Sequence, residues 1–148
     1  MVIELLEPET DHECIAAATH HFQQLAQDNE SVNSNVEAVH ELERAHLQCG
    51  LQTVDSQGCV LVGTQTVAKF NEASESSRNI VRIQLGLIRL PTVDTDVLIT
   101  LNQVVGMGAS SSSNTQFGSQ CGHSIVSASE FESIVCQFDV NDWNLFAG

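Results

Sequence analysis

The sequence predicts an α+β fold in which helices pack on the faces of a central antiparallel sheet. Three observations favour this class. The middle of the chain alternates apolar and polar residues as strands do, a segment near each end has apolar residues at helical spacing, and no internal repeat is present. The length of 148 residues suits one domain, covering 1–148, that buries an adequate core without metals or disulfides.

The best-patterned segment covers residues 79–102 and predicts a β-hairpin. Apolar residues recur at every second position in 81–87 and again in 97–101, and this period, with its β-branched residues, is typical of strands. Pro91 fixes φ and cannot donate a ladder hydrogen bond, so a turn is expected between the two strands. The opposite face also carries apolar residues, so helices are expected to cover both faces.

The first thirty residues predict a short strand followed by a helix. Residues 2–7 form a short apolar strand that ends at Pro8. Thr10 and Glu13 have the spacing of a capping box, which predicts a helix from there to about Asp28. Its apolar stripe consists of Ile15, Ala18, Phe22 and Leu25, and the neighbouring His20 and His21 are expected to be packed or solvated rather than ligands.

The rest of the chain has weaker patterns. Residues 36–51 could form a helix by propensity, but their short apolar repeats also allow a strand, and we favour a strand followed by a short helical or irregular piece. Residues 55–58 are expected to form a hairpin turn, and residues 59–70 a strand with an irregularity at Gly63. Residues 105–123, rich in Gly and Ser, predict a surface loop. A second helix follows, capped by Ser127 or Ser129, and its apolar stripe consists of Phe131, Ile134, Val135 and Phe138. In the tail after it, Trp143, Leu145 and Phe146 are expected to pack against the rest of the domain.

Acidic residues dominate the charge. The formal net charge is −14, and no Lys or Arg precedes Arg44. A field of this sign repels nucleic acid and anionic lipid and attracts a basic protein surface, although solubility alone explains the charge equally well. No apolar run approaches the length of a membrane span and no signal peptide is present, so we expect a nuclear and cytoplasmic protein without membrane insertion.

Motifs of catalysis and cofactor binding are missing from the sequence. It contains no G-x-S-x-G, no H-E-x-x-H and no dinucleotide fingerprint. Asp94 and Asp96 could act as an acid–base pair, but turn formation explains them more simply. Five scattered cysteines without a C-x-x-C pair predict reduced, mostly buried thiols, and Cys121 with His123 does not make a metal site. We therefore expect no catalytic residue, cofactor or metal.

Four segments together resemble the Mog family, the Ran guanine nucleotide release factors. They are VIELLE at 2–7, GTQTVAKFNE at 63–72, LGLIRLPTVDTDVLITLN at 85–102 and DVNDWNLFAG at 139–148. Their order and spacing match the family, and the resemblance extends over nearly the whole chain, more weakly in 31–57 and the serine-rich loop. The hairpin segment is the most specific of the four.

The resemblance implies a fold, a partner and a contact site. The fold is the three-layer α/β/α sandwich with a central antiparallel sheet shared with PsbP-like proteins. The partner is the small GTPase Ran, whose nucleotide the family helps to release in support of nuclear transport, without enzyme chemistry of its own. The family's Ran-contacting acidic pair corresponds here to Glu4 and Glu7, which belong to the acidic half of the chain.

One departure from the family concerns the start of the chain. Family members usually begin with a longer segment that contains Gly-Gly-Ala and Val-Pro-Asp-x-Gln-Glu-Val motifs and supplies early strands. Here the sequence starts at what resembles a later strand, so we expect a domain that lacks its N-terminal strands and has an open sheet edge.

Two other functions compete with Ran binding. The runner-up is a protein-binding adaptor without nucleotide-release activity, because animal members of the family are linked to delivery of a sodium channel to the cell surface. A small hydrolase that uses His123 is the third.

Overall fold

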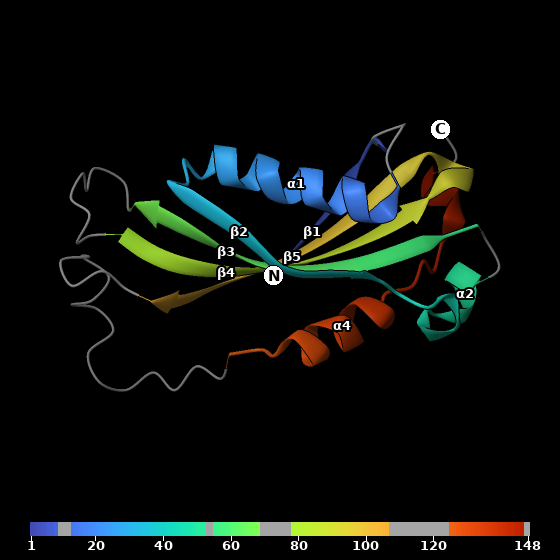
Figure 1. Ribbon diagram of the computed structural model, residues 1–148. Helices are drawn as coiled ribbons and strands as arrows, with labels where there is room; N and C mark the ends of the chain where they lie inside the picture. The colour runs from blue at the N-terminus through green and yellow to red at the C-terminus, as the bar shows by residue number, and fades with distance from the viewer. Residues whose placement is uncertain (9–12, 53–54, 69–77, 107–124, 147–148) are drawn as a thin grey trace.

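A computed structural model describes residues 1–8, 13–52, 55–68, 78–106 and 125–146. Five antiparallel strands form one sheet in the order β1-β5-β4-β3-β2. Figure 1 shows α1 on one face of the sheet and α2 and α4 on the other. The expected three-layer α/β/α arrangement is therefore confirmed. The elements are β1 (Val2–Leu6), α1 (Cys14–Asp28), β2 (Asn33–Glu41), η1 (Arg44–His46), α2 (Cys49–Gln52), β3 (Gln57–Ala68), β4 (Arg78–Leu90), η3 (Pro91–Val93), β5 (Thr95–Gly106), α4 (Ala128–Cys136) and η4 (Trp143–Phe146).

The sheet separates two hydrophobic cores, because alternate residues of a strand point to opposite faces. The α1 core lies between α1 and the sheet and consists of Cys14, Ala17, Ala18, Phe22, Cys59, Leu61, Ile83, Leu85, Leu87 and Leu98. The α4 core lies on the other face and consists of Leu42, Leu47, Leu51, Val60, Ile88, Leu90, Val97, Ile99, Phe131 and Val135. Both faces of the central strands are thus covered, as the apolar residues on both of their faces predicted.

The predicted hairpin is confirmed in its strands and its turn. β4 and β5 pair from Ile80 with Gly106 to Leu90 with Thr95. The short helix η3 begins at Pro91, and Asp94 closes the turn with φ of 50°, in the left-handed region. A short polar residue is well suited to this conformation, and its side chain is exposed.

The predictions for 36–70 are confirmed in part. A strand, β2, is followed by the short helices η1 and α2, as expected. The irregularity predicted at Gly63 is instead in the neighbouring strand: β3 is regular through Gly63 in its pairing with β4, and the register with β3 shifts in β2 between Val36 and Ala38, beside the Gly63–Val36 pair. The prediction of a hairpin turn at 55–58 is wrong, because β2 and β3 are joined through η1 and α2 and β3 already begins at Gln57.

The predicted start of α1 is also wrong. The helix begins at Cys14, and its N-cap residue, Glu13, has an extended backbone and makes no side-chain cap hydrogen bond. Thr10 lies outside the described residues. The stripe is centred on Ala18 and Phe22 as predicted, but Cys14 and His21 are buried with them while Ile15 is only half-buried.

At the other end of the chain, the predicted capping box of α4 is confirmed. The Ser127 hydroxyl accepts a hydrogen bond from the Glu130 amide, and the Glu130 carboxylate accepts one from the Ser127 amide. Trp143 and Phe146 pack against the α4 core as expected. Leu145 does not dock: it is 79% exposed. The serine-rich loop lies largely outside the described residues.

Candidate functional site

The two predicted contact residues lie at one edge of the sheet, in the segment 1–7, which we name the β1 edge. β1 pairs with β5, and in the described part of the chain no strand pairs with its other side. Glu4 is in the middle of β1, and Glu7 follows its last residue, Leu6. Both glutamates are exposed. The structure thus places the pair at the β1 side of the described sheet, with both carboxylates exposed to an approaching protein surface.

Strand alternation assigns the side chains of the β1 edge to the two faces of the sheet. Glu4 is opposite Leu98, whose side chain lies in the α1 core, so Glu4 is on the α1 face. Ile3 is opposite Ile99, which lies in the α4 core. Glu4 is therefore presented at the margin of the α1 layer, with its neighbours in the strand pointing to the other face.

Apolar side chains surround the glutamates. Met1, Val2, Ile3 and Leu5 are each exposed by half or more of their surface: 65%, 53%, 51% and 60%. An exposed strand of this composition has unpaired backbone groups, apolar surface and carboxylates in one short segment. These are the elements of a protein-binding surface with an apolar centre and charged positions.

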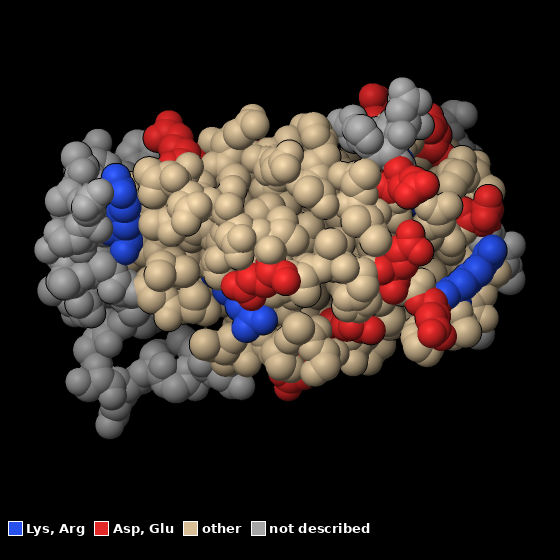
Figure 2. Space-filling view, viewed as in Figure 1, with Lys and Arg blue, Asp and Glu red and all other residues tan. Residues whose placement is uncertain are grey.

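Negative charge extends well beyond the β1 edge. Figure 2 shows many more Asp and Glu side chains than Lys and Arg side chains on the face in view. In the described part of the chain, no ion pair involves Glu4 or Glu7. Their charge is therefore available to a basic partner.

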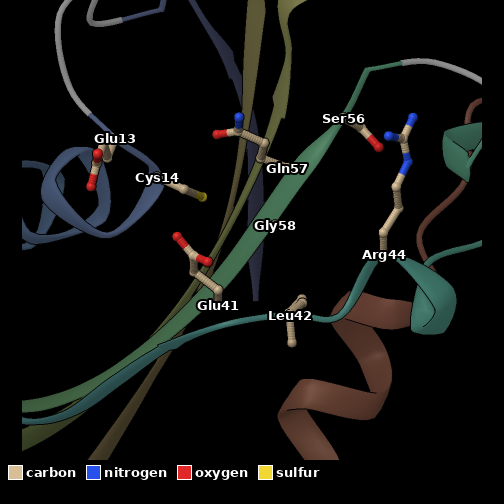
Figure 3. Close-up of a pocket in the computed structure, with 8 residues that line it drawn as sticks. All are labelled: Glu13, Cys14, Glu41, Leu42, Arg44, Ser56, Gln57 and Gly58. Atoms are coloured by element: carbon tan, nitrogen blue, oxygen red, sulfur yellow. The ribbon is translucent and has the colours of Figure 1, made fainter.

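A pocket of about 380 Å³ lies near the start of α1. Figure 3 shows Glu13 and Cys14 on one side, the end of β2 with Glu41 below, and β3 with Gln57 behind. The remaining lining residues are Leu42, Arg44, Ser56 and Gly58. Sequence reasoning missed this pocket, because it depends on how the β2–β3 connection folds against α1.

The described lining residues of the pocket do not form a set typical of a hydrolase. No histidine is present among its described lining residues, and the buried Ser56 hydroxyl donates its hydrogen bond to the Leu51 carbonyl at 2.7 Å. Within the described residues, no group of three or more His, Cys, Asp or Glu side chains could hold a metal ion. His123, the residue of the hydrolase alternative, lies outside the described residues.

Comparison with known proteins identifies the family of this chain. Residues 1–104 match the family model described as "Ran-interacting Mog1 protein". The chain belongs to this family. The matched residues extend from β1 almost to the end of β5, so the family region of this Mog1-family chain contains the β1 edge and nearly the whole sheet.

Curated relatives carry names of the same kind. A Ran guanine nucleotide release factor of Danio rerio is 34% identical over 119 residues, which cover 76% of this chain and 60% of that protein. A probable Ran guanine nucleotide release factor of Dictyostelium discoideum and the Ran guanine nucleotide release factor of Homo sapiens are each 29% identical over 99% of this chain and 74% of their own length. The chain thus spans three fifths to three quarters of these relatives.

No described helix of this Mog1-family chain combines the length and the apolar character that crossing a membrane requires.

Proposed function

We propose that this chain binds the small GTPase Ran and promotes release of its guanine nucleotide. In this proposal the chain is located in the nucleus and the cytoplasm and supports protein transport between them. The observation that carries the proposal is the family match over residues 1–104, which includes the β1 edge. The names of the relatives from three organisms support it.

The proposed contact surface is the β1 edge. Glu4 and Glu7 are exposed carboxylates beside exposed apolar residues, and the net charge of the chain is −14. Charges of this kind steer a basic partner and set its orientation, while the apolar side chains are buried on contact. In this proposal the carboxylates engage basic groups of Ran.

Release of nucleotide requires more than binding. A partner shifts an equilibrium only by the difference between its affinities for the two states. The chain must therefore bind nucleotide-free Ran more tightly than loaded Ran. Carboxylates placed near the nucleotide site meet this requirement, because they compete with the phosphates and disturb the magnesium that holds them.

The test is a release assay on the full chain. Ran is loaded with a fluorescent guanine nucleotide, unlabelled nucleotide is added in excess, and the loss of fluorescence is followed with and without the chain. We expect faster release with the chain. We also expect the Glu4→Lys/Glu7→Lys variant to bind Ran about tenfold more weakly, equivalent to about 1.4 kcal/mol.

A matched variant controls for net charge. Asp28→Lys/Glu30→Lys makes the same change in charge at exposed positions at and beyond the end of α1. It should retain both binding and release. Binding of Ran by the wild-type chain without any release would instead support the adaptor function, and undiminished binding by a folded Glu4→Lys/Glu7→Lys variant would reject the β1 edge as the contact surface.

A further inference from the structure

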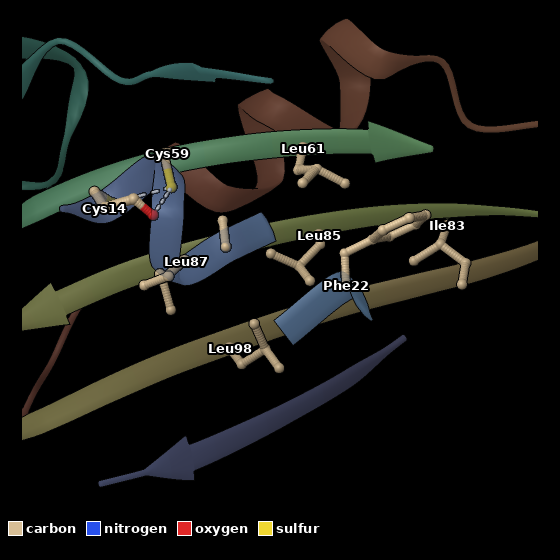
Figure 4. Packing of buried hydrophobic residues seen from close by; sticks show 10 residues of the cluster. Cys14, Phe22, Cys59, Leu61, Ile83, Leu85, Leu87 and Leu98 are labelled. Atoms are coloured by element: carbon tan, nitrogen blue, oxygen red, sulfur yellow. Dashed lines mark hydrogen bonds between the residues drawn. The ribbon is translucent and has the colours of Figure 1, made fainter. Parts of the chain in front are cut away.

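Two thiols meet where α1 begins. The Cys14 sulfur lies 3.0 Å from the Cys59 sulfur, and the Cys59 thiol donates a hydrogen bond to the Cys14 carbonyl at 3.2 Å. Figure 4 shows the two side chains converging from α1 and β3 at one end of the α1 core. Both are free cysteines. A disulfide has an S–S distance of about 2 Å, so a closure of about one ångström would bond them.

Cys14 also lines the pocket described above. In Figure 3 its sulfur points into the space between Glu41 and Gln57. Only 1% of Cys14 is exposed, so contact with the solution is restricted to this small area of the pocket wall. Glu13 and Glu41 add two carboxylates to a lining in which Arg44 is the one cation among the described residues. A small, uncharged oxidant therefore suits the pocket better than an anionic one.

The surroundings give the two sulfurs different roles. Cys14 is the first residue of α1, a helix of 15 residues, and it belongs to the lining of the pocket. Cys59 is completely buried. The hydrogen bond with Cys14, and then burial, raise the pKa of the Cys59 thiol far above its ordinary value of 9.0. Cys14 is thus the sulfur that meets an oxidant, and Cys59 stays protonated beside it.

We propose that Cys14 and Cys59 are a modification site at which a small hydroperoxide, such as hydrogen peroxide, converts the two thiols into a disulfide. The Cys14 thiolate attacks one peroxide oxygen, so that an S–O bond forms and the O–O bond breaks. The departing hydroxide takes up the proton that Cys14 released and becomes water. Cys14 is then a sulfenic acid.

The second step joins the two sulfurs. The Cys59 sulfur attacks the Cys14 sulfur, an S–S bond forms and the S–O bond breaks. The hydroxide leaves as water with the proton of Cys59. In sum, the two thiols lose two hydrogens and the peroxide is reduced to two waters. The cross-link ties the start of α1 to β3 and closes a loop between positions 45 residues apart. Formation of this disulfide does not depend on the proposed release of nucleotide from Ran.

Peptide mapping of the full chain tests the proposal. The chain is treated with equimolar hydrogen peroxide, unreacted thiols are alkylated, and the protein is cleaved after Lys and Arg and before Asp without reduction. Cys14 then lies in the peptide 11–27 and Cys59 in 55–69, while Cys49 lies separately in 45–54. We expect 11–27 and 55–69 to be joined, and the link to disappear on reduction. The oxidised chain should have a Tm higher by roughly 5–10 °C.

Single substitutions test the two roles. In Cys59→Ala, peroxide should leave a sulfenic acid on Cys14 that dimedone traps; in Cys14→Ala, Cys59 should remain unmodified. Cys136→Ala is the matched control, because Cys136 is half-buried and remote in sequence, and burial raises the pKa of its thiol. It should form the link as the wild type does.

The wild-type map alone decides the proposal if a variant fails to fold. Absence of the 11–27/55–69 link, or a disulfide that joins other cysteines in its place, overturns the proposal. Dimedone labelling of Cys59 in Cys14→Ala, without labelling of Cys14 in Cys59→Ala, overturns the assignment of roles.

Discussion

Arg89 and Asp96 form a buried ion pair across the β4–β5 hairpin. They are directly opposite each other in the register, and Arg89 Nε donates a hydrogen bond to Asp96 Oδ1 at 3.0 Å. Their side chains are 11% and 1% exposed, so the charges are largely withdrawn from water. Asp94, by contrast, is exposed in the turn. The two aspartates therefore do not form an acid–base pair, and Asp96 is structural.

Asp96→Ala should strongly destabilise the protein. It removes the carboxylate partner from a desolvated ion pair, and breaking such a pair costs about 3–5 kcal/mol. Urea unfolding measures the change. Asp94→Asn is the control and should have almost no effect, because its side chain is exposed and asparagine tolerates a φ of 50°.

The apolar replacement Arg89→Met/Asp96→Leu separates the charge from the packing. It removes both charges together and should recover much of the stability lost in Asp96→Ala, since apolar pairs often replace buried ion pairs without loss. Equal instability of the single and double variants would show that the site depends on the hydrogen bond itself.

Gly86→Ala should disturb the contact between β4 and α4. A Cβ at Gly86 would collide with Val135 Cγ2 and lie 3.0 Å from Val135 Cγ1. Val135 is completely buried, so its side chain has little room to move, and overpacking of this kind costs about 1–3 kcal/mol. In a Val135→Ala background, Gly86→Ala should cost about 1–2 kcal/mol less, a coupling that a double-mutant cycle of unfolding free energies measures.

Gly63 provides the contrast. A Cβ at Gly63 would lie 2.6 Å from the carbonyl oxygen of Asn35 and 2.7 Å from Phe22 Cζ. Trimming Phe22 removes only the second contact, and the backbone oxygen remains. Gly63→Ala should therefore destabilise the chain in both the wild-type and the Phe22→Leu background. If Phe22→Leu fully restored the stability lost in Gly63→Ala, the backbone at Asn35 would have to shift to make room for the new Cβ.

The hairpin could be predicted from the sequence because its signals are local. Period-two apolar residues define the strands and Pro91 defines the turn, so the pairing that places Arg89 opposite Asp96 follows from the turn length. The capping box of Ser127 and Glu130 is equally local, and it too is present.

The Cys14–Cys59 contact and the pocket beside it could not be predicted, because they join segments far apart in sequence. Their geometry depends on where α1 begins, and the Thr10 spacing suggested an earlier start than Cys14. The exposure of Leu145 has the same origin: an apolar residue in a tail docks only if the core beside it has space. Glu4 and Glu7 were found through a resemblance, since exposed acids beside a strand have no distinctive pattern.

Stability should depend on pH through Glu130. Hydrogen bonds from the Ser127 amide and hydroxyl hold the pKa of this carboxyl below its ordinary value of 4.5. The unfolded chain therefore binds the proton more readily, so the contribution of Glu130 is complete above pH 4.5 and is lost as pH falls through the lowered folded pKa. Glu130→Gln should be less stable than the wild type at pH 7, by a margin that shrinks below pH 4.5 in urea unfolding.

The Ser127 hydroxyl is the control for this linkage. In a Ser127→Ala background one of the two donors is missing, so the pH-dependent part of the Glu130→Gln effect should be smaller. A margin that stays constant from pH 7 to pH 3 would assign the effect of Glu130 to helix propensity, which does not titrate.

The proposed Ran contact makes a prediction about salt as well as affinity. Association of the acidic chain with a basic surface should slow as ionic strength rises, because the Debye length falls from about 10 Å at 0.1 M to about 3 Å at 1 M. Glu4→Lys/Glu7→Lys should associate about tenfold more slowly at low salt and approach the wild-type rate at 1 M, with little change in the dissociation rate, as is usual for charges at an interface rim. Asp28→Lys/Glu30→Lys changes the total charge equally but lies away from the β1 edge. Stopped-flow measurements of the association rate over a salt series distinguish the two variants. If only the β1 edge variant has a shallower salt dependence than the wild type, the steering is assigned to Glu4 and Glu7. If the association rates of both variants depend equally on salt, the steering is assigned to the overall field of the chain.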